Sequence, residues 1–315
     1  MADMNGISSK EALELLNISD ELELFKCFSR ASELREKYCG QTIVPCSIIN
    51  ARCGGCPEDC AFCAQSKSSK AQFDKYPLVS KETMFKAAEK AAADKASYFS
   101  VVTSGTAVNA SKELNIICEA IEKITKELPI KACASLGILN KKALRQLKDS
   151  GMTRYHHNLE TAGSYFGKIC TTRSYESQLD TIRFAKELGI ALCVGGIFGM
   201  GESKEQRIEL LETIRSLDVD SVPLNFLNPI QGTKLEKMDD LSPRECLKII
   251  AAARLMMPDK SIRICGGRER NLGDFQSWIF FAGADGIMIG GYLVTSGREV
   301  GDDLKMIEGS GLTIP

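Results

Sequence analysis

Short apolar stretches alternate with longer amphipathic stretches along most of the chain, from about residue 43 onward. Several of the short stretches are apolar nearly throughout, which is typical of parallel strands that are buried on both faces. The pattern predicts eight strands, at Ile43–Asn50, Tyr98–Thr103, Lys131–Leu136, Arg154–Leu159, Ala191–Ile197, Ser221–Phe226, Ser261–Cys265 and Gly286–Ile289.

The amphipathic stretches between these strands predict helices. Ser242-Pro243-Arg244-Glu245 is a clear start signal, because it places serine at the N-cap, proline at the first helical position and glutamate at the third. The predicted helices are Lys81–Lys95, Ser111–Glu127, Lys141–Asp149, Ser177–Leu188, Lys204–Leu217, Pro243–Met256 and Asp274–Phe281. Two more helices are predicted before the first strand, one from the capping box of Ser8 and Glu11 to Asn17, and one from Asp20 to Tyr38.

Eight strand–helix units over about 270 residues predict an α/β fold, a single (β/α)8 barrel of the TIM type, with its active site at the carboxyl ends of the strands. No linker rich in proline, glycine or serine divides the chain. We therefore expect residues 1–40 to form an N-terminal helical lead-in and residues 41–315 to form one barrel domain. The loop Cys53–Val79 is long for such a barrel, and long loops of this kind are usually functional.

Charge and composition narrow the class of protein. The net charge is −1 without a sustained basic stripe, so neither nucleic acid nor an acidic membrane surface is an expected partner. No apolar run approaches the ~20 residues of a membrane span, and Met1–Asn5 do not resemble a signal peptide. We expect a cytoplasmic protein. In that reducing compartment, 13 cysteines indicate metal or redox chemistry, and with only two histidines the ligands would be thiolates.

Three cysteines in the long loop, Cys56, Cys60 and Cys63, follow the first predicted strand at spacings of four and three. Three soft ligands in such a cluster bind either an iron–sulfur cluster or zinc, and three is one short of a closed tetrahedral site. One interpretation is a structural zinc site completed by a cysteine such as Cys53, in a protein without catalysis. The other is an iron–sulfur cluster with one iron open to another ligand.

The C-x3-C-x2-C spacing after a first barrel strand resembles the radical S-adenosylmethionine (SAM) superfamily. In that superfamily the three cysteines hold a [4Fe–4S] cluster, SAM binds the fourth iron, and an electron cleaves SAM to a 5′-deoxyadenosyl radical. The resemblance implies that Phe62 packs against adenine. The stretch from Gly195 to Glu202 fits the pattern G-x-I-x-G-x-x-E of these enzymes, which implies that Gly195, Gly196 and Ile197 approach the adenine as well.

Further motifs are similar to those of the biotin synthase family, and they extend over nearly the whole chain. They are Ile48–Ala51, Cys56–Cys60, Cys63–Ser66, Tyr155–Thr161, Thr171–Tyr175 and Ile262–Glu269. The resemblance implies a sulfurtransferase that inserts sulfur into dethiobiotin with SAM-derived radicals, so no side chain is expected to be a catalytic acid or base. It also implies a flavodoxin- or ferredoxin-type electron donor and a homodimer.

The same resemblance assigns contacts residue by residue. Asn158 and Glu160 match positions that contact SAM, although the family more often has aspartate at the second. Asn225 matches a residue that contacts the ureido ring of dethiobiotin. From its chemistry, the amide of Asn158 can bridge cofactor and substrate, and we interpret His156 and His157 as residues of the substrate pocket or the core rather than as metal ligands. An amide suits the cyclic urea of this substrate because it offers both donors and acceptors.

The auxiliary cluster that supplies sulfur is where this sequence departs from the family. The usual [2Fe–2S] cluster is held by cysteines of the second, third and fifth strands and by an arginine of the seventh. Cys133, Cys193 and Arg263 match three of these ligands, but Ser100 stands where the second strand should supply a cysteine. We expect Cys46 to replace it, and Cys46, Cys133 and Cys193 to bind an auxiliary cluster of another type, such as a four-iron cluster with a non-protein sulfide.

Cys265 is an alternative ligand for this cluster, and Arg263 a neighbouring donor. Cys265 follows Arg263 by two residues and therefore points to the same face of the strand. For Cys46 and Cys265, an interpretation as small buried packing residues stays open. Two other functions also stay open, because the maturase of iron-only hydrogenase and methylornithine synthase have a similar barrel and cysteine loop. The sequence Cys56-Pro57-Glu58-Asp59-Cys60, together with Gln65-Ser66, favours biotin synthase.

Overall fold

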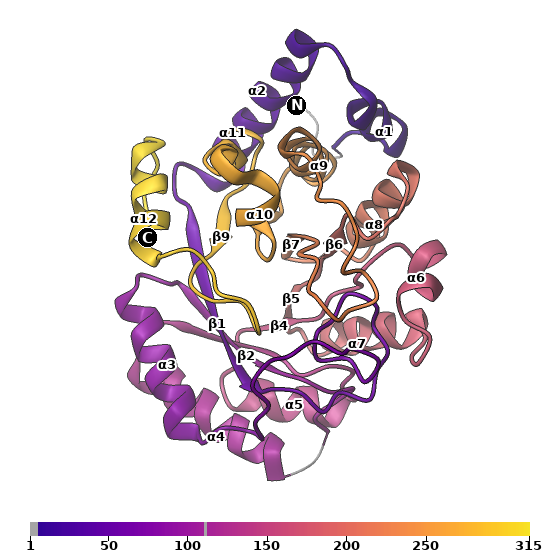
Figure 1. Cartoon of the computed structure of the whole chain (residues 1–315). Helices are drawn as coiled ribbons and strands as arrows, with labels where there is room; N and C mark the ends of the chain where they lie inside the picture. Colours follow the sequence, from indigo (N-terminus) through magenta and orange to yellow (C-terminus); the bar gives the residue numbers. More distant parts are fainter. Residues whose placement is uncertain (1–5, 110–111) are drawn as a thin grey trace.

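Parallel strands form a closed barrel in the computed structural model, which describes residues 6–109 and 112–315 (Figure 1). Within these residues the strands pair in the order β5-β4-β3-β2-β1-β9-β8-β7-β6, and a further pairing of β5 with β7 closes the sheet. The strands are β1 Val44–Arg52, β2 Tyr98–Thr103, β3 Lys131–Ser135, β4 Arg154–His156, β5 Ala191–Cys193, β6 Gly196–Phe198, β7 Ser221–Phe226, β8 Ser261–Ile264 and β9 Gly286–Met288. The predicted (β/α)8 fold is confirmed.

The fifth predicted strand is broken into β5 and β6, and proline is the physical reason. Gly195, between the two pieces, lies beside Pro223 of β7, because Cys193 pairs with Ser221 and Gly196 with Leu224. Proline has no N–H to donate to a ladder, so the pairing is interrupted there. The two pieces together occupy one barrel position.

Helices surround the barrel and bury apolar side chains against its strands. In the described residues they are α1 Ser9–Asn17, α2 Glu21–Cys39, α3 Lys81–Ala93, α4 Lys112–Glu127, α5 Lys141–Asp149, α6 Gly163–Ile169, α7 Tyr175–Glu187, α8 Lys204–Ser216, α9 Pro243–Met256, α10 Arg268–Leu272, α11 Trp278–Phe281 and α12 Val300–Gly309. The predicted capping boxes of Ser8 with Glu11 and of Ser242 with Glu245 are both present. The predicted start of α4 at Ser111 lies outside the described residues.

The helix predicted over Asp274–Phe281 is wrong as a continuous element. A 3-10 turn at Gly273–Phe275 and the short α11 occupy this region instead, and the short helix α10, which was not predicted, precedes it. Gly273 has a positive φ of 49°, which favours glycine and ends α10. Helices α6 and α12 were not predicted, since α6 follows a strand end without a side-chain cap and α12 begins after a Gly-rich loop.

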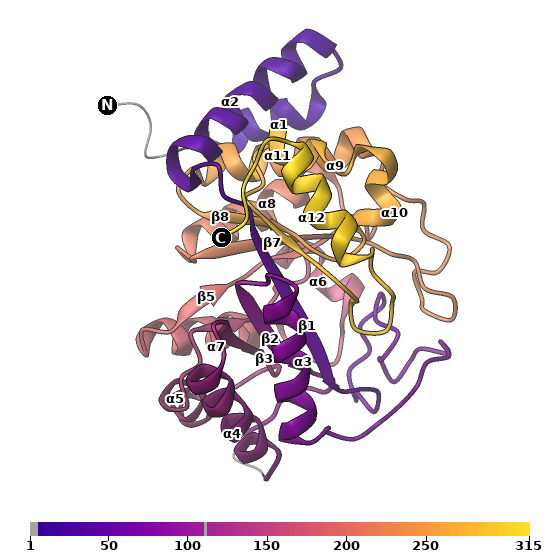
Figure 2. The same ribbon diagram turned by 90° about the vertical axis from the view of Figure 1, so that its left-hand side faces the viewer.

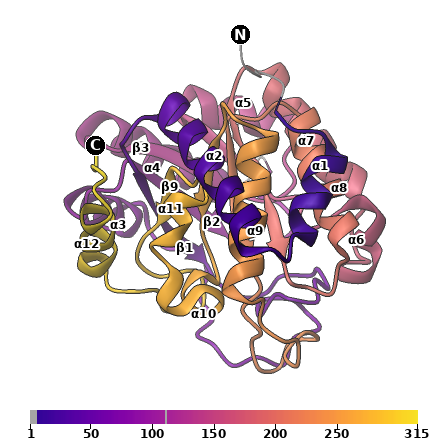
Figure 3. The ribbon, with the colours of Figure 1, turned by 90° about the horizontal axis from the view of Figure 1, so that it is seen from above.

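The N-terminal helices lie on the outside of the barrel. Helix α1 packs against α8 and α9, and α2 packs against α9 and α11 (Figures 1 and 3). The C-terminal segment returns to the start of β1, where the N–H of Ile43 donates to the carbonyl of Thr313 at 2.8 Å. In the described part of the chain, no helix is both long and apolar enough to span a membrane.

The long loops gather at the carboxyl ends of the strands. Figure 2 shows the loops after β1, β7 and β9 projecting from the same side of the barrel. The loop after β1 carries Cys56, Cys60 and Cys63, and it contacts the loop after β7 through the N–H of Lys70, which donates to the carbonyl of Gly232 at 2.8 Å. This end of the barrel is where the predicted site residues lie.

Candidate active site

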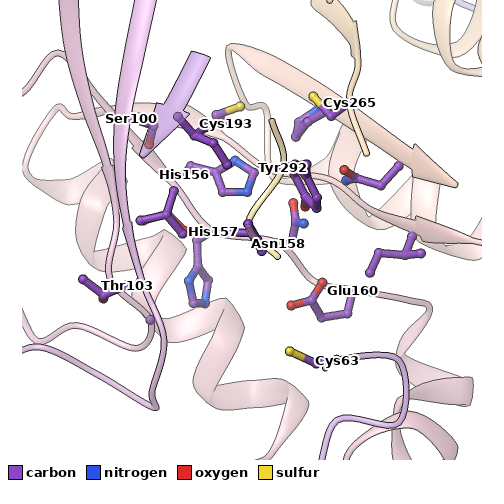
Figure 4. Close-up of a pocket in the computed structure, with 18 of the residues that line it drawn as sticks. Cys63, Ser100, Thr103, His156, His157, Asn158, Glu160, Cys193, Cys265 and Tyr292 are labelled. Carbon is purple, nitrogen blue, oxygen red and sulfur yellow. The ribbon is translucent and has the colours of Figure 1, made fainter. Parts of the chain in front are cut away.

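One cavity inside the barrel, at the carboxyl ends of the strands, brings together both predicted groups of cysteines. Its cysteines are the loop thiols Cys56, Cys60 and Cys63, and the barrel thiols Cys46, Cys133, Cys193 and Cys265. Figure 4 shows Cys63 on one side of the cavity and Cys193 and Cys265 on the other. His156 and Tyr292 lie between them (Figure 4). The cavity therefore has two thiol-bearing ends with space for other molecules between them.

Polar contacts fix the loop that carries the loop thiols. The carboxylate of Asp59 accepts hydrogen bonds from the N–H groups of Thr171, at 2.8 Å, and Thr172, at 3.2 Å. Hydrogen bonds from the hydroxyl and N–H of Thr171 hold the pKa of Asp59 well below its usual range, so it is a carboxylate at neutral pH. The N–H of Ala61 donates to the carbonyl of Ile169 at 2.8 Å.

The neighbouring Glu58 ties the same loop to a second part of the barrel rim. It is buried, and its carboxylate accepts from the hydroxyl of Thr106, at 2.5 Å, and from that of Thr172. Gln65 accepts from the N–H of Gly54 at 2.8 Å and holds the base of the loop. The Glu-Asp pair of the cysteine motif and the Thr-Thr pair after α6 thus form one anchor.

The loop thiols fit an iron–sulfur cluster in their arrangement. All three line the same cavity, and burial raises the pKa of the Cys63 thiol to about 11 and that of Cys60 above its ordinary value. Within residues 6–109 and 112–315, no three histidine, cysteine, aspartate or glutamate side chains converge on a point that could hold one metal ion. A [4Fe–4S] cluster binds each thiolate on a separate iron, so its ligands need not converge.

Glu160 and Arg173 form an ion pair on the wall of the cavity next to these thiols. Their Oε1 and Nη2 atoms are 3.4 Å apart, and both side chains are largely buried. Burial raises the pKa of Glu160, against the opposing effect of Arg173. Glu160 also has a φ of 67°, which is uncommon for a residue other than glycine and often marks a functional position.

Unpaired polar atoms in the cavity point to a polar ligand. Asn158 Oδ1, Arg173 Nε and Thr103 Oγ1 are buried and have no hydrogen-bond partner among the described residues, and all three residues line the cavity. Buried polar atoms are nearly always paired in folded proteins. Phe62 contributes an aromatic ring to the same lining. This set fits a ligand such as SAM, which has an adenine ring and several hydrogen-bonding groups.

The two histidines have different surroundings. His157 is buried, and its Nε2 lies 3.0 Å from Oε1 of Gln178. Nε2 of Gln178 donates in turn to the carbonyl of Asn158 at 3.3 Å. Burial lowers the pKa of His157 to about 3, so the ring is neutral and supports the position of Asn158. His156 lines the cavity beside Cys193. Burial opposes protonation of His156, but the hydrogen bond with Cys193 and the negative charges of Cys193, Glu160 and Cys46 together raise the pKa of His156.

The glycines of the predicted adenine motif lie behind the cavity wall. A Cβ on Gly195 would stand 1.8 Å from the carbonyl oxygen of Pro223, and one on Gly196 would stand 2.7 Å from that of Glu160. Ile197 lines the cavity. Glu202, at the end of the motif, accepts hydrogen bonds from the N–H groups of two loop residues and from Arg207. Strand packing and loop closure therefore account for much of this motif.

The barrel thiols come from β1, β3, β5 and the residue after β8. Cys46 and Cys265 are in hydrogen-bond contact, and this contact, assisted by Arg263, lowers the pKa of the Cys46 thiol below its ordinary value. Burial raises the pKa of Cys133 to about 12. For Cys193, burial opposes ionisation, but the hydrogen bond from His156 and the positive charges of His156, Arg154 and Arg263 together lower the pKa below its ordinary value. These thiols lie among cationic side chains, which suits an anionic cluster.

Ser100 lies next to Cys133, where β2 pairs with β3. Its hydroxyl oxygen is buried without a partner among the described residues. On β1, Ile48 pairs with Ser100 and Cys46 pairs with Tyr98, so Cys46 lies one layer deeper in the barrel than the serine. Cys46 thus approaches the same interior from the neighbouring strand.

Asn225 lines the cavity with part of its hydrogen-bonding capacity in use. Its Nδ2 donates to the carbonyl of Gly196 at 3.1 Å, and its Oδ1 accepts from the N–H of Gly266 at 3.0 Å. An amide has two donors and two acceptor positions, so one of each is left for a ligand. The two backbone contacts fix the orientation of this amide.

Sequence reasoning missed several residues of the cavity. Arg173 was matched only as part of a motif, while Arg154 and Tyr292 were given no role. Tyr292 lies in the loop after β9, and a Cβ on Gly266 would stand 2.9 Å from its ring, so the ring packs directly on that backbone. Only the closure of the barrel brings this late loop beside the early cysteines. For Tyr292, the pairs Gly266-Gly267 and Gly290-Gly291 were the one available signal in the sequence that two stretches of backbone approach closely there.

Comparisons with known proteins agree with this site. The family model of the radical SAM superfamily matches residues 52–214, and that of the biotin and thiamin synthesis associated domain matches residues 223–313. A biotin synthase of Geotalea daltonii is 48% identical over 97% of this chain and 92% of its own length. A biotin synthase of Pelobacter propionicus is 49% identical over 98% of this chain and 94% of its own length.

Among solved structures, methylornithine synthase has the same fold. It superposes with a TM-score of 0.85, covering 98% of this chain and 94% of its own, at 20% sequence identity. At that identity the likeness shows the fold alone. The identity of 48–49% to two biotin synthases over almost the whole chain shows the family. This chain belongs to the biotin synthase family of the radical SAM superfamily.

Proposed function

We propose that this chain is a radical SAM sulfurtransferase that converts dethiobiotin to biotin. The observation that carries the proposal is the presence of two thiol sets in one cavity, with polar and aromatic side chains between them. A reaction that needs a radical from one cofactor and sulfur from another requires both within reach of one substrate. When bound, the first cluster would supply the electron that cleaves SAM, and the second would supply the sulfur atom.

For the first cofactor we propose the loop thiols as ligands of the [4Fe–4S] cluster, with SAM alongside. Glu160, held by Arg173 at 3.4 Å, is suited to accept hydrogen bonds from the ribose hydroxyls. Asn158 has a free Oδ1 toward the same space. Phe62 and Ile197 provide the apolar surface for the adenine. Gly195 and Gly196 contribute by letting the strands approach closely.

For the auxiliary cluster we propose Cys46, Cys133 and Cys193 as ligands, with Cys265 as an alternative ligand and Arg263 as a neighbouring donor. The contact between Cys46 and Cys265 supports both as candidates for the same ligand position, because the two thiols are neighbours in the barrel interior. Serine at position 100 is a hard, weakly acidic ligand for iron, whereas thiolates suit iron–sulfur clusters. A ligand set without a cysteine on the second strand favours a cluster other than the usual [2Fe–2S] type, such as a four-iron cluster.

The substrate would lie between the two ends of the cavity. The free donor and acceptor of Asn225 match the N–H and C=O groups of the cyclic urea of dethiobiotin. His156 and Asn158 border the same space. These side chains bind and orient the substrate and exclude water, and none of them needs to act as an acid or a base.

Two further features of the proposal rest on resemblance, namely a flavodoxin- or ferredoxin-type electron donor and a homodimer. Two others rest on the sequence pattern, namely a cytoplasmic location and a division into a helical lead-in of residues 1–40 and a barrel domain of residues 41–315. The location agrees with the chemistry, because exposed thiolate clusters persist in a reducing compartment. The division agrees with α1 and α2 lying outside the barrel.

The test is an anaerobic assay with dethiobiotin, SAM and a reductant, using protein reconstituted with iron and sulfide. We expect 5′-deoxyadenosine and biotin to form together. The C60A variant should form neither, while it keeps the folded circular-dichroism spectrum of the parent. Cleavage of SAM without biotin would refute the sulfur-insertion function but leave radical SAM chemistry, and absence of SAM cleavage would refute both.

A further inference from the structure

Arg154 is a cation of the cavity that the proposed reaction leaves without a role. Among the described residues, the cavity lining includes Arg154, Arg173 and Arg263. Arg173 pairs with Glu160, and Arg263 is the arginine implied by the family. Arg154 begins β4, where it pairs in register with Cys133 of β3. It therefore enters the barrel interior at the level of the barrel thiols.

Arg154 and Arg263 share one aromatic ring. The guanidinium carbon of Arg154 lies 4.3 Å from the centroid of Tyr98, and that of Arg263 lies 4.9 Å from the same centroid. Nη2 of Arg154 also hydrogen-bonds the Tyr98 hydroxyl at 3.3 Å. A ring face attracts a cation, but this attraction is small beside the cost of keeping two like charges together away from water.

No carboxylate in the described part of the chain lies within 4.0 Å of either guanidinium. Asp285 is bound to Arg254 at 2.6 Å, and Glu160 is bound to Arg173. Nε of Arg154 is buried and has no hydrogen-bond partner among these residues. Arg263 is buried and Arg154 is partly buried. Charges withdrawn from water are normally paired, so two such cations side by side favour the binding of another anion.

Arg263 donates hydrogen bonds to the hydroxyl of Ser221 and the carbonyl of Val44, which are neutral, and the ionisable groups beside the two cations are the barrel thiols. Cys133 is the register partner of Arg154, and the Cys46 thiol is hydrogen-bonded to Arg263. An iron–sulfur cluster held by thiolates is anionic. Two guanidinium groups at the same level of the barrel suit that negative charge.

We propose that Arg154 is a positioning residue for the auxiliary cluster and that, with Arg263, it balances the negative charge of a cluster held among the barrel thiols. This inference rests on the proposed function, because it needs an auxiliary cluster in the barrel. Arg154 acts through the charge and the hydrogen bonds of its guanidinium, and Tyr98 keeps it aimed at the thiols.

The test compares R154Q, R154K and R145Q in the full chain, reconstituted anaerobically with 57Fe and sulfide. Arg145 is an exposed residue of α5 and serves as the matched control. Mössbauer spectra and sulfide content separate the two clusters, and a chelator challenge measures how firmly each is held. We expect R154Q to hold the auxiliary iron about 10- to 100-fold more weakly. R154K should hold most of it, and R145Q should match the parent.

Melting temperatures with and without clusters provide a second readout. If Arg154 serves the cluster, the rise in melting temperature on reconstitution shrinks in R154Q. If it serves only the packing of Tyr98, R154Q lowers both melting temperatures equally and keeps its iron, which overturns the inference. Auxiliary iron held as firmly in R154Q as in R145Q also overturns it, while the proposed function stands. A parent protein with only one cluster refutes both.

Discussion

Glu160 and Arg173 form an ion pair, with 3.4 Å between Oε1 and Nη2, on the cavity wall beside the loop thiols. Because both side chains are largely buried, removing the cation leaves the carboxylate without its partner. Truncating one member of such a pair costs about 2–5 kcal/mol in a binding site. We expect R173M to raise the dissociation constant for SAM at least about tenfold, as measured by equilibrium dialysis with the reconstituted protein.

Arg183 offers a matched control for this experiment, because it is a half-exposed arginine of α7 that pairs with Glu176 and Asp180 away from the cavity. R183M should bind SAM like the parent protein. E160D, which keeps the charge with a shorter side chain, should fall between R173M and the parent. Equal affinities of R173M and R183M would show that the ion pair does not support SAM binding.

The contact between Gly195 and Pro223 gives a prediction about stability. A Cβ on residue 195 would stand 1.8 Å from the Pro223 carbonyl oxygen, so the two strands must separate to accept it. We expect G195A to lower the free energy of unfolding by about 3 kcal/mol or more, as measured by denaturant titration of the cluster-free chain. Gly301, in α12, has no atom within 4 Å of its Cβ position. G301A should therefore stabilise slightly, by about 0.5–1 kcal/mol.

The contact between Gly195 and Pro223 also separates what the sequence could predict about the fold from what it could not. The G-x-I-x-G-x-x-E pattern identified the correct strand, and periodicity predicted the barrel, because both depend on local order along the chain. The reason for Gly195 was not readable, since it depends on Pro223 of the next strand. The register between two strands depends on tertiary packing, so the residues of one strand do not by themselves show which residues of the next strand they contact.

In the candidate site, too, only the residues that form a local sequence pattern were predictable. The loop thiols were predictable, because three ligands within eight residues are a local pattern. Cys46 and Cys265 are far apart in the sequence, and their contact arises only when the barrel closes. Tyr292 had no motif at all. Its place in the cavity follows from a tight turn, in which Tyr292 and Thr295 exchange backbone hydrogen bonds of 2.9 and 2.8 Å.

The ligand role of Cys46 can be tested by its removal. We expect C46A to lose the iron and sulfide of the auxiliary cluster, because the contact of Cys46 with Cys265 and Arg263 places its thiol among the other candidate ligands. The [4Fe–4S] cluster of the loop thiols and SAM cleavage should be retained, since none of their candidate ligands is changed. Iron and sulfide analysis together with Mössbauer spectroscopy measures both clusters.

C118A is the control for that variant, because Cys118 is buried in the apolar core on α4, away from the cavity. It should keep both clusters. C265A distinguishes the two candidate ligands from one another. An auxiliary signal unchanged in C46A but lost in C265A would remove Cys46 from the ligand set and put Cys265 in its place.

Tyr292 separates the two ends of the cavity, and its ring packs on the backbone of Gly266, next to Cys265. Replacing it by alanine opens the space in which the substrate would lie, without touching a candidate cluster ligand. Misplacement of a substrate by about 1 Å can cost 100-fold in rate. We expect Y292A to form biotin up to about 100-fold more slowly while SAM cleavage continues, so that the ratio of 5′-deoxyadenosine to biotin rises.

The phenylalanine variant tells a positioning ring from a reacting hydroxyl. Y292F keeps the ring on Gly266 and removes only the hydroxyl, so it should keep the product ratio of the parent and its KM for dethiobiotin. Y292A should raise that KM, because the wall that holds the substrate is gone. If Y292F raises the ratio of 5′-deoxyadenosine to biotin as much as Y292A does, the hydroxyl is the important group and the packing argument is wrong. If neither variant changes the ratio, the substrate lies elsewhere in the cavity.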